Sequence, residues 1–283
     1  MQFGLNLKTL VVIPIILFIF SVYTLFYNYT TTGSFILRDI DLKGGTLITI
    51  ETSAQVDTKF LENKLTEKYG SVLISSLKTS TGYGASIEVD VSINPNDVIK
   101  YVKSLGMNVV SFSIETIGPA LGELFFQQII SVLTVAFVLM SIVIFIIYRN
   151  PVSVFAIVFS ILADILTTLA LTSLIGIKIS FAGLAGILML IAYGVDSNIV
   201  LTNKVLRTTP EDFNKEFKKA FITGATISVT ITATMAAVSL LSMSKLLTNI
   251  ADILVVGFLV DLVNTWILNS AMLQWWVNRR HKA

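Results

Sequence analysis

Three aspartates stand inside strongly apolar segments of the chain: Asp164, Asp196 and Asp261. A charge within a lipid bilayer is costly, so ionisable residues at such places usually carry function. The apolar segments hold no Lys or Arg near their centres, so the aspartates have no obvious internal counter-ion, and burial favours the protonated form of each carboxyl group. Such groups can take up and release protons. The alternative is that they are neutral hydrogen-bonding groups that join helices.

Polar side chains at helical spacing accompany Asp164 and Asp261. Asp261 is followed closely by Asn264 and Thr265, which predicts a polar cluster. The helical face of Asp164 also carries three hydroxyl residues at steps of four: Ser160, Thr168 and Thr172. This polar stripe is expected to face other protein and not lipid.

Asp196 is followed by Asn198 and lies on a helical seam of mostly small side chains, which predicts a tightly packed neighbouring helix. The seam consists of Ala182, Ala185, Met189, Ala192, Asp196, Ile199 and Asn203. A later apolar segment is the candidate neighbour, because one of its faces carries hydroxyl groups that could donate to a buried carboxylate. These residues are Thr223, Thr226, Thr230 and Thr234.

The sequence therefore predicts a proton relay. We expect Asp196 to cycle its proton, and Asp164 with the threonines to tune or relay it. The candidate residues are Asp196, Asp164, Asp261, Asn198, Thr223, Thr226 and Thr230.

Six stretches are long and apolar enough to position these residues in a membrane, since a span needs about twenty predominantly apolar residues. They cover residues 8–29, 124–148, 152–174, 179–201, 219–243 and 250–276. Lys and Arg gather in the loops after the second and fourth stretches and in the tail, which predicts cytoplasmic termini in a multi-pass protein of the cell membrane. The segment between the first two stretches is then extracytoplasmic.

The composition agrees with a membrane protein and excludes several classes of function. Of the 283 residues, 54% are hydrophobic and only 13% are charged, about half the charged share of a soluble protein. The net charge of +2 forms no basic field for nucleic acid. The chain has no cysteine and only one histidine, His281, so we expect no metal site, no cofactor and no enzyme activity.

Residues 30–117 are expected to form a separate extracytoplasmic domain, between residues 1–29 with the first span and the five-span region 118–283. Strands are predicted at 46–51, 71–78, 85–93 and 110–115, and helices at 57–69 and 95–105. This β-α-β-β-α-β order is typical of a ferredoxin-like split βαβ sandwich. Its acids are scattered as on any solvated face, so the domain shows no catalytic signature.

Several short motifs, together with this layout, resemble the SecD/SecF family of protein-export membrane proteins, and within it the archaeal-type SecF branch. Residues 41–46 resemble the family's Asp-x-x-Gly-Gly signature, and residues 118–124 resemble its Gly-Pro-x-x-Gly entry to the second span. Residues 192–201 resemble its fourth-span motif. The matching positions are Asp41, Gly44, Gly45, Gly118, Pro119, Gly122, Tyr193, Gly194 and Asp196.

Two departures from the family pattern stand out. Asp164 matches the aspartate of the family's His-Asp pair, but Ala163 replaces the histidine. Bacterial relatives also place an arginine at the start of the fifth span, where the nearest residue here is Lys219, followed by Ala220. Lysine is a movable point charge, so the relay could differ from the bacterial one.

The resemblance implies a polytopic α-helical protein that assists polypeptide translocation with SecD and the Sec protein-conducting channel as partners. The family belongs to the resistance-nodulation-division superfamily, whose members couple proton movement through intramembrane acids to motion of external domains. A passive subunit that stabilises the translocase is an alternative, and an independent small-molecule exporter of the superfamily is another. An intramembrane aspartyl protease is disfavoured, because its Gly-x-Gly-Asp signature is replaced by Tyr-Gly-Val-Asp at residues 193–196.

Overall fold

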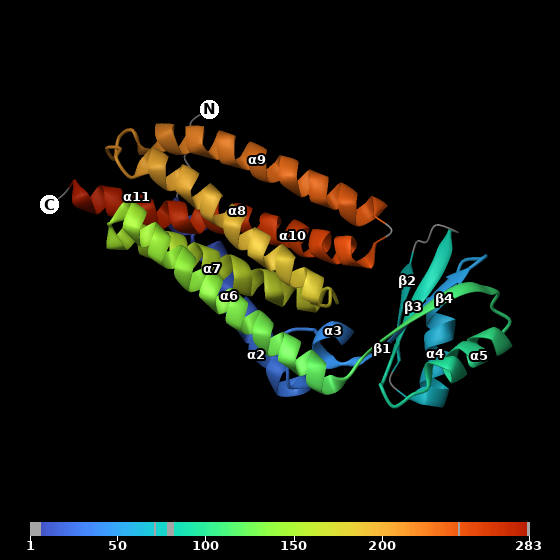
Figure 1. Cartoon of the computed structure of the whole chain (residues 1–283). Helices are drawn as coiled ribbons and strands as arrows, with labels where there is room; N and C mark the ends of the chain where they lie inside the picture. The colour runs from blue at the N-terminus through green and yellow to red at the C-terminus, as the bar shows by residue number, and fades with distance from the viewer. Residues whose placement is uncertain (1–6, 71, 78–81, 243, 282–283) are drawn as a thin grey trace. The chain divides into compact units, whose positions relative to one another are not determined.

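Among the residues that the structure describes, six helical segments are long and apolar enough to cross a membrane, as the sequence predicts. The structure is a computed structural model that describes residues 7–70, 72–77, 82–242 and 244–281 (Figure 1). The sixth segment is continuous over three elements, because α10 runs into a π-helix and then into α11. The segments are α2 (Val12–Thr32), α6 (Pro119–Tyr148), α7 (Pro151–Leu174), α8 (Phe181–Val205), α9 (Phe213–Leu241) and α10 (Lys245–Val263) with η1 (Asn264–Asn269) and α11 (Ser270–Arg280).

The chain divides into two compact units, which we call the helix unit and the sheet unit. The helix unit comprises the residues up to Leu37, Ser131–Leu241 and the residues from Leu246 on. The sheet unit comprises Arg38–Ile130 and Ser242–Lys245. The sheet unit therefore includes the start of α6 and the first residue of α10. The boundaries predicted from the sequence, at residues 29/30 and 117/118, stay predictions.

Capping side chains determine where α7 and α8 begin. The Asn150 side chain accepts a hydrogen bond from the Val152 amide at 3.1 Å, and Pro151 stands at the first position of α7, where its missing N–H is not needed. The Ser180 hydroxyl caps α8 by accepting from the Gly183 amide at 3.0 Å. Short loops connect α6 to α7 and α7 to α8, and α7 packs against α8.

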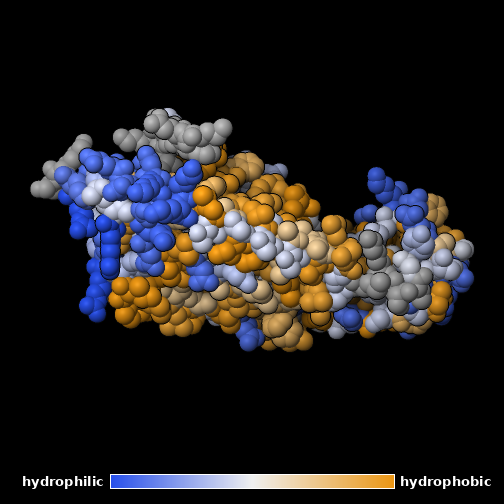
Figure 2. Space-filling view, turned by 90° about the horizontal axis from the view of Figure 1, so that it is seen from above, coloured by the Kyte–Doolittle hydropathy of each residue, from blue (hydrophilic) through white to orange (hydrophobic). Residues whose placement is uncertain are grey.

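The interior of the helix unit lies around α7 and α8. The first span, α2, packs against α7, α9 packs against α8, and η1 packs against both α7 and α8. Ile144 of α6 joins Ile157 and Ile161 of α7 and Ile191 of α8 in one apolar cluster. The outer faces of α2, α6 and α9 expose large apolar side chains, and Figure 2 shows the hydrophobic surface that results. Such a surface suits lipid.

The sheet unit has the predicted order of elements and is built on one four-stranded sheet. Adjacent strands are all antiparallel, in the order β2-β3-β1-β4. This is the arrangement of a split βαβ sandwich. A short helix, α3 (Ile40–Lys43), precedes the first strand. The elements are β1 (Gly45–Thr52), α4 (Thr58–Tyr69), β2 (Leu73–Leu77), β3 (Tyr83–Val89), α5 (Pro95–Ser104) and β4 (Val109–Ile117).

The core of the sheet unit lies between one face of the sheet and the two helices. Ile48 pairs across β1 with Ile87 of β3 and with Ile114 of β4, which places these residues on one face. Leu61 and Leu65 of α4, together with Val98 and Val102 of α5, complete the same buried cluster. Alternating side chains on the strands and a spacing of four on the helices therefore create the core, as the sequence pattern indicates.

The third strand is shorter than the alternating pattern of residues 85–93 predicts. It ends at Val89, because the Asp90 carboxylate accepts hydrogen bonds from the Ser92 amide at 2.9 Å and the Ser92 hydroxyl at 2.7 Å. These bonds turn the chain and hold the pKa of Asp90 below its ordinary value. Of the predicted second strand, Leu73–Leu77 is observed, while residues 71 and 78 lie outside the described residues.

Candidate functional site

Two of the three aspartates that the sequence singles out lie close together in the interior of the helix unit. Asp164 of α7 is 1% exposed and Asp261 of α10 is 2% exposed. Both face Gly194 of α8, since a Cβ atom at Gly194 would lie 3.6 Å from Oδ2 of Asp164 and 3.9 Å from Oδ1 of Asp261. The glycine therefore brings the α8 backbone close to both carboxyl groups.

Hydroxyl and amide groups from α8 and η1 hold Asp261. Its Oδ1 accepts hydrogen bonds from the Ser197 hydroxyl at 2.9 Å and the Thr265 hydroxyl at 2.7 Å. The Thr265 oxygen in turn accepts from the Asn198 side-chain nitrogen at 2.9 Å, and Asn269 donates to the Asn198 side-chain oxygen. These side chains form a continuous polar network that connects α8 to the sixth span.

Asp164 is less fully paired. Its Oδ1 accepts from the Asn264 side-chain nitrogen at 2.8 Å, but its Oδ2 has no hydrogen-bond partner among the described residues. The buried hydroxyl of Thr168 and the side-chain oxygen of Asn264 are also without a partner in that part of the chain. A protonated Asp164 would present an O–H donor, where an ionised one presents only acceptors. Protonation would therefore change this carboxyl group from an acceptor only to a donor as well.

The π-helix η1 explains how one span serves both aspartates. Asn264 bonds Asp164 of α7, while the next residue, Thr265, bonds Asp261 and Asn198. A π-helical turn holds an extra residue, so consecutive side chains can be presented differently from those of a regular α-helix, and such turns are frequent at functional sites.

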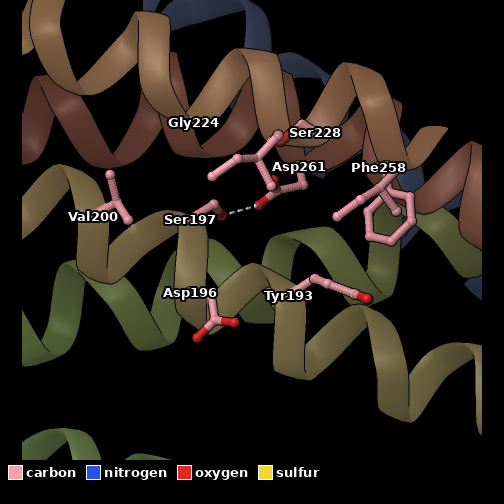
Figure 3. A pocket seen from close by; sticks show the side chains of 10 residues that line it. Tyr193, Asp196, Ser197, Val200, Gly224, Ser228, Phe258 and Asp261 are labelled. Carbon is pink, nitrogen blue, oxygen red and sulfur yellow. Dashed lines mark hydrogen bonds between the residues drawn. The ribbon is translucent and has the colours of Figure 1, made fainter. Parts of the chain in front are cut away.

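A small cavity of about 130 Å³ reaches Asp261 from between α8, α9 and α10 (Figure 3). Gly224 and Ser228 of α9 line it on one side, and the rings of Tyr193 and Phe258 stand edge to face at 5.2 Å. In Figure 3 the Ser197 side chain points to Asp261, whereas the Asp196 carboxylate points away from this pair. A cavity of this size can admit water to Asp261.

Asp196 is exposed within this chain, so the prediction that one of the chain's own helices packs tightly on its seam is wrong. The neighbouring seam residues Ala185, Met189 and Ala192 are exposed as well. Successive residues of a helix point in different directions, so Asp196 is exposed although it lines the cavity beside Ser197, while Ser197 and Asn198 are buried. Asn198 thus lies in the buried cluster and Asp196 does not.

The threonines of α9 do not donate to a buried carboxylate. Thr223, Thr226 and Thr230 are exposed, and their hydroxyls donate instead to backbone oxygens four residues earlier, at 3.1, 2.7 and 2.8 Å. Threonine hydroxyls in helices readily make this local bond, which removes the need for an outside partner. Thr234 behaves in the same way, donating at 2.9 Å to the Thr230 oxygen. Lys219 pairs with Glu216 of its own helix at 2.5 Å.

Ser197 and Asn269 complete the buried cluster, although sequence reasoning did not propose them as site residues. Asn269 is fully buried, and an amide inside an apolar span is itself a signal that could have identified it. Ser197 offers a weaker signal, because serine is common in membrane helices. The predicted stripe beside Asp164 is confirmed as buried, since Ser160, Thr168 and Thr172 are at most 1% exposed.

The glycine motifs of residues 41–46 and 118–124 pack against each other in the sheet unit. A Cβ atom at Gly122 would lie 2.6 Å from the Gly44 nitrogen, and one at Gly44 would lie 2.6 Å from the Pro119 Cα. Gly44 and Gly45 also adopt positive φ values of 81° and 148°. Only residues without a side chain permit this backbone contact. Asp41 lies in the first turn of α3, and Gly118 directly precedes α6.

The chain is similar to known proteins over most of its length. Residues 97–279 match the family described as "Protein export membrane protein SecD/SecF, C-terminal". The "Protein-export membrane protein SecF" of Pyrococcus furiosus is 33% identical over 96% of this chain and 92% of its own. The protein of the same name from Methanocaldococcus jannaschii is 33% identical over 95% of both chains.

The fold is shared with a solved structure, a crystal structure of the translocon-associated membrane protein SecDF from Thermus thermophilus. The TM-score is 0.79 at 19% sequence identity. The similarity covers 99% of this chain but only 39% of that longer chain. At this level of identity the likeness concerns the fold of six spans and a sheet domain.

Proposed function

Because the chain belongs to the SecD/SecF family of protein-export membrane proteins, we propose that it is the SecF subunit of a SecD-SecF complex and that it couples proton movement to polypeptide export. Relatives that this chain matches over 92% and 95% of their own length are named SecF, and six apolar spans make the chain a multi-pass membrane protein.

The observation that carries the proposal is the pair of buried carboxyl groups beside Gly194. Neither Asp164 nor Asp261 has a salt-bridge partner in the described part of the chain, and each is at most 2% exposed. Two ionised carboxylates in such a place would be strongly unfavourable, so the pair holds at least one proton. A proton that moves on or off changes the hydrogen bonds to Asn264, Ser197 and Thr265.

The cavity gives this proton a route. Water in the space next to Asp261 can deliver a proton to its carboxylate, and the Ser197 and Thr265 hydroxyls can reorient as donors or acceptors. Asp164, which also lies beside Gly194, accepts the proton next. Its unpaired Oδ2 is the atom that we assign to hold it.

The sixth span can pass the change to the sheet unit. The helix that carries Asp261 begins at Lys245, which belongs to the sheet unit and pairs with Asp39 at 3.2 Å. Asp39 is 4% exposed and also accepts from the Ile40 amide at the start of α3. An adjustment of α10 on protonation would therefore change the position of Lys245 in its ion pair with Asp39 within the sheet unit.

The exposed seam of α8 is the surface that we assign to SecD. An acid that faces lipid is unfavourable, so Asp196 and its small neighbours require a protein partner. In this arrangement both termini are cytoplasmic and the sheet domain is extracytoplasmic, where it meets the polypeptide that leaves the Sec channel. The excess of Lys and Arg in the loops after α6 and α8 supports this orientation.

One observation favours a second function, that of a passive subunit. The hydrogen bonds of Asp164 and Asp261 to Asn264, Ser197 and Thr265 are also those of neutral groups that only join helices. In that case the chain would stabilise the translocase without moving protons.

Replacement of Asp261 by Asn separates the two functions, because Asn keeps most hydrogen bonds but cannot titrate. Export of a secreted protein is measured in cells whose only SecF is the variant, together with recovery of the complex. We expect Asp261→Asn to reduce export to the level of cells without SecF while the complex stays intact. The matched control is Asp252→Asn on the same helix, whose carboxylate accepts from Ser239 of α9. Normal export by Asp261→Asn would exclude proton coupling through Asp261 and favour the passive subunit.

A further inference from the structure

A second, larger cavity lies at the end of the helix unit that carries the C-terminus. Its volume is about 570 Å³, and four separate segments line it: the end of α6, the α6–α7 loop, the end of α8 and the end of α11. None of its residues belongs to the polar network around Asp164 and Asp261. Those that matter for its chemistry are Ile147, Tyr148, Asn150, Asn203, Arg207 and Arg280.

The polar side of this cavity suits an oxyanion. Arg207 and Arg280 each contribute a guanidinium group, and neither forms a salt bridge within the described ranges of the chain. The Tyr148 hydroxyl bonds the side-chain oxygen of Asn203 at 2.9 Å, which leaves the Asn203 nitrogen as a donor. No carboxylate is among the lining residues. Paired guanidinium groups with an amide donor match the geometry of a phosphate group.

The apolar side of the cavity distinguishes a lipid from a soluble phosphate. Ile147 lines the cavity and is 58% exposed, and it continues the exposed apolar face of α6 that includes Val143 and Ile146. Figure 2 shows a hydrophilic band at one end of the helices directly beside hydrophobic surface. A ligand here therefore meets cationic donors at one end and a lipid-facing helix at the other.

We propose that this cavity binds the phosphate headgroup of an anionic phospholipid, with the acyl chains along α6. Basic pockets between membrane helices bind such headgroups through the same combination of charge and apolar contact. The site ties together the ends of α6, α8 and α11, so a bound lipid would also hold the ends of the helices that carry the polar network. This inference holds whether or not the buried aspartates carry protons.

Native mass spectrometry of the purified full-length chain tests the site. The protein is exchanged into micelles with equal amounts of phosphatidylglycerol and phosphatidylcholine, and retained lipid is counted per chain. We expect one retained phosphatidylglycerol and about a tenfold loss of it in the double variant Arg207→Gln/Arg280→Gln. The matched control is Arg279→Gln, because Arg279 stacks on Trp275 at 5.3 Å and does not line this cavity.

Three results would overturn the proposal: equal retention of the two lipids, unchanged retention by the double variant, or displacement of the lipid by millimolar inorganic phosphate. The last result would identify the ligand as a soluble phosphate. Arg280→Lys refines the assignment, since it keeps the charge but loses the planar fork and should retain an intermediate amount of lipid. The arginines are exposed, so the variants should fold, and a monodisperse elution profile checks that they do.

Discussion

The two faces of α8 differ in burial and in hydrogen bonding, although neighbouring residues of the same short segment form both faces. On the inward face, Gly194, Ser197 and Asn198 belong to a buried polar network that involves α7 and the sixth span. On the outward face, Ala192 and Asp196 are exposed. The described residues provide Ser197 and Asn198 with hydrogen-bond partners from the sixth span, whereas the Asp196 carboxylate stays exposed. A single helix thus serves an internal site and, on our proposal, an intermolecular one.

The difference shows why an intramembrane acid is not by itself a proton site. Asp196 is an acid within the family motif, but it is Asp164 and Asp261 that are buried and accept hydrogen bonds from neighbouring side chains. Surroundings, and not residue type, determine whether a carboxyl group can hold a proton against water. Asp196 would acquire such surroundings only in contact with a partner.

The largest effect is expected from a bulky residue on the inward face. In Gly194→Leu, atoms beyond Cβ would enter the space between Asp164 and Asp261, because Cβ itself already lies 3.6 and 3.9 Å from their oxygens. We expect a loss of about 1–3 kcal/mol in the free energy of unfolding in mild detergent, and loss of export. Ala192→Leu on the outward face is the matched control and should leave the stability of the isolated chain unchanged. Equal destabilisation by the two substitutions would remove the distinction between the faces.

A bulky residue on the outward face is expected to act on assembly. Ala192→Trp should reduce co-purification with the SecD partner by about tenfold, which corresponds to about 1.4 kcal/mol. The isolated chain should stay folded, because Ala192 is exposed. Val143→Trp on α6, where the valine is 54% exposed, is the control for a tryptophan on an apolar surface. Undiminished recovery of the partner with Ala192→Trp would exclude this face as the interface.

The packing of α9 on the sixth span gives a prediction of intermediate size. An alanine Cβ at Gly224 would lie 2.2 Å from the Trp266 ring, so the ring or the helix must shift. We expect Gly224→Ala to destabilise the chain by about 1–2 kcal/mol, and a second change, Trp266→Leu, to restore part of the loss. Thermal unfolding in detergent measures both, and additive effects of the two changes would argue against this contact.

The smallest effect is expected at the threonines of α9. Thr226→Ala removes only a hydroxyl that bonds to the Ile222 oxygen of its own helix, at 2.7 Å. The free energy of unfolding should change by no more than about 0.5 kcal/mol, and export should be normal. Ser228→Ala is the variant to compare with it, because Ser228 lines the cavity at Asp261 and Thr226 does not. A severe export defect in Thr226→Ala would contradict this expectation and support a role of Thr226 in the proton relay.

Much of the fold follows from the sequence because its patterns are local. Twenty-residue apolar stretches and the alternation in residues 85–89 and 110–114 indicate the six spans and most of the sheet. The end of β3 escaped prediction because one side chain, Asp90, turns the chain despite continued alternation. Such a bond depends on a single rotamer and not on a pattern.

The site was harder to predict, for a physical reason. In a membrane helix both the lipid-facing and the protein-facing sides are apolar, so hydrophobic periodicity does not tell which way Asp196 points. A helical wheel also does not reveal that Thr223 and Thr226 are satisfied by their own backbone. Asp164 and Asp261 are buried, which agrees with the expectation for acids inside apolar spans, but the π-helix that carries Asn264 and Thr265 has no sequence signature.

The central claim is that the carboxyl pair beside Gly194 carries protons, and proton flux tests it most directly. The SecD-SecF complex is reconstituted into vesicles that contain a pH-sensitive dye, and acidification is followed after a membrane potential is imposed. The account predicts flux with the unaltered complex and with Asp252→Asn, and none with Asp164→Asn or Asp261→Asn. Undiminished flux with both of the latter variants would contradict it.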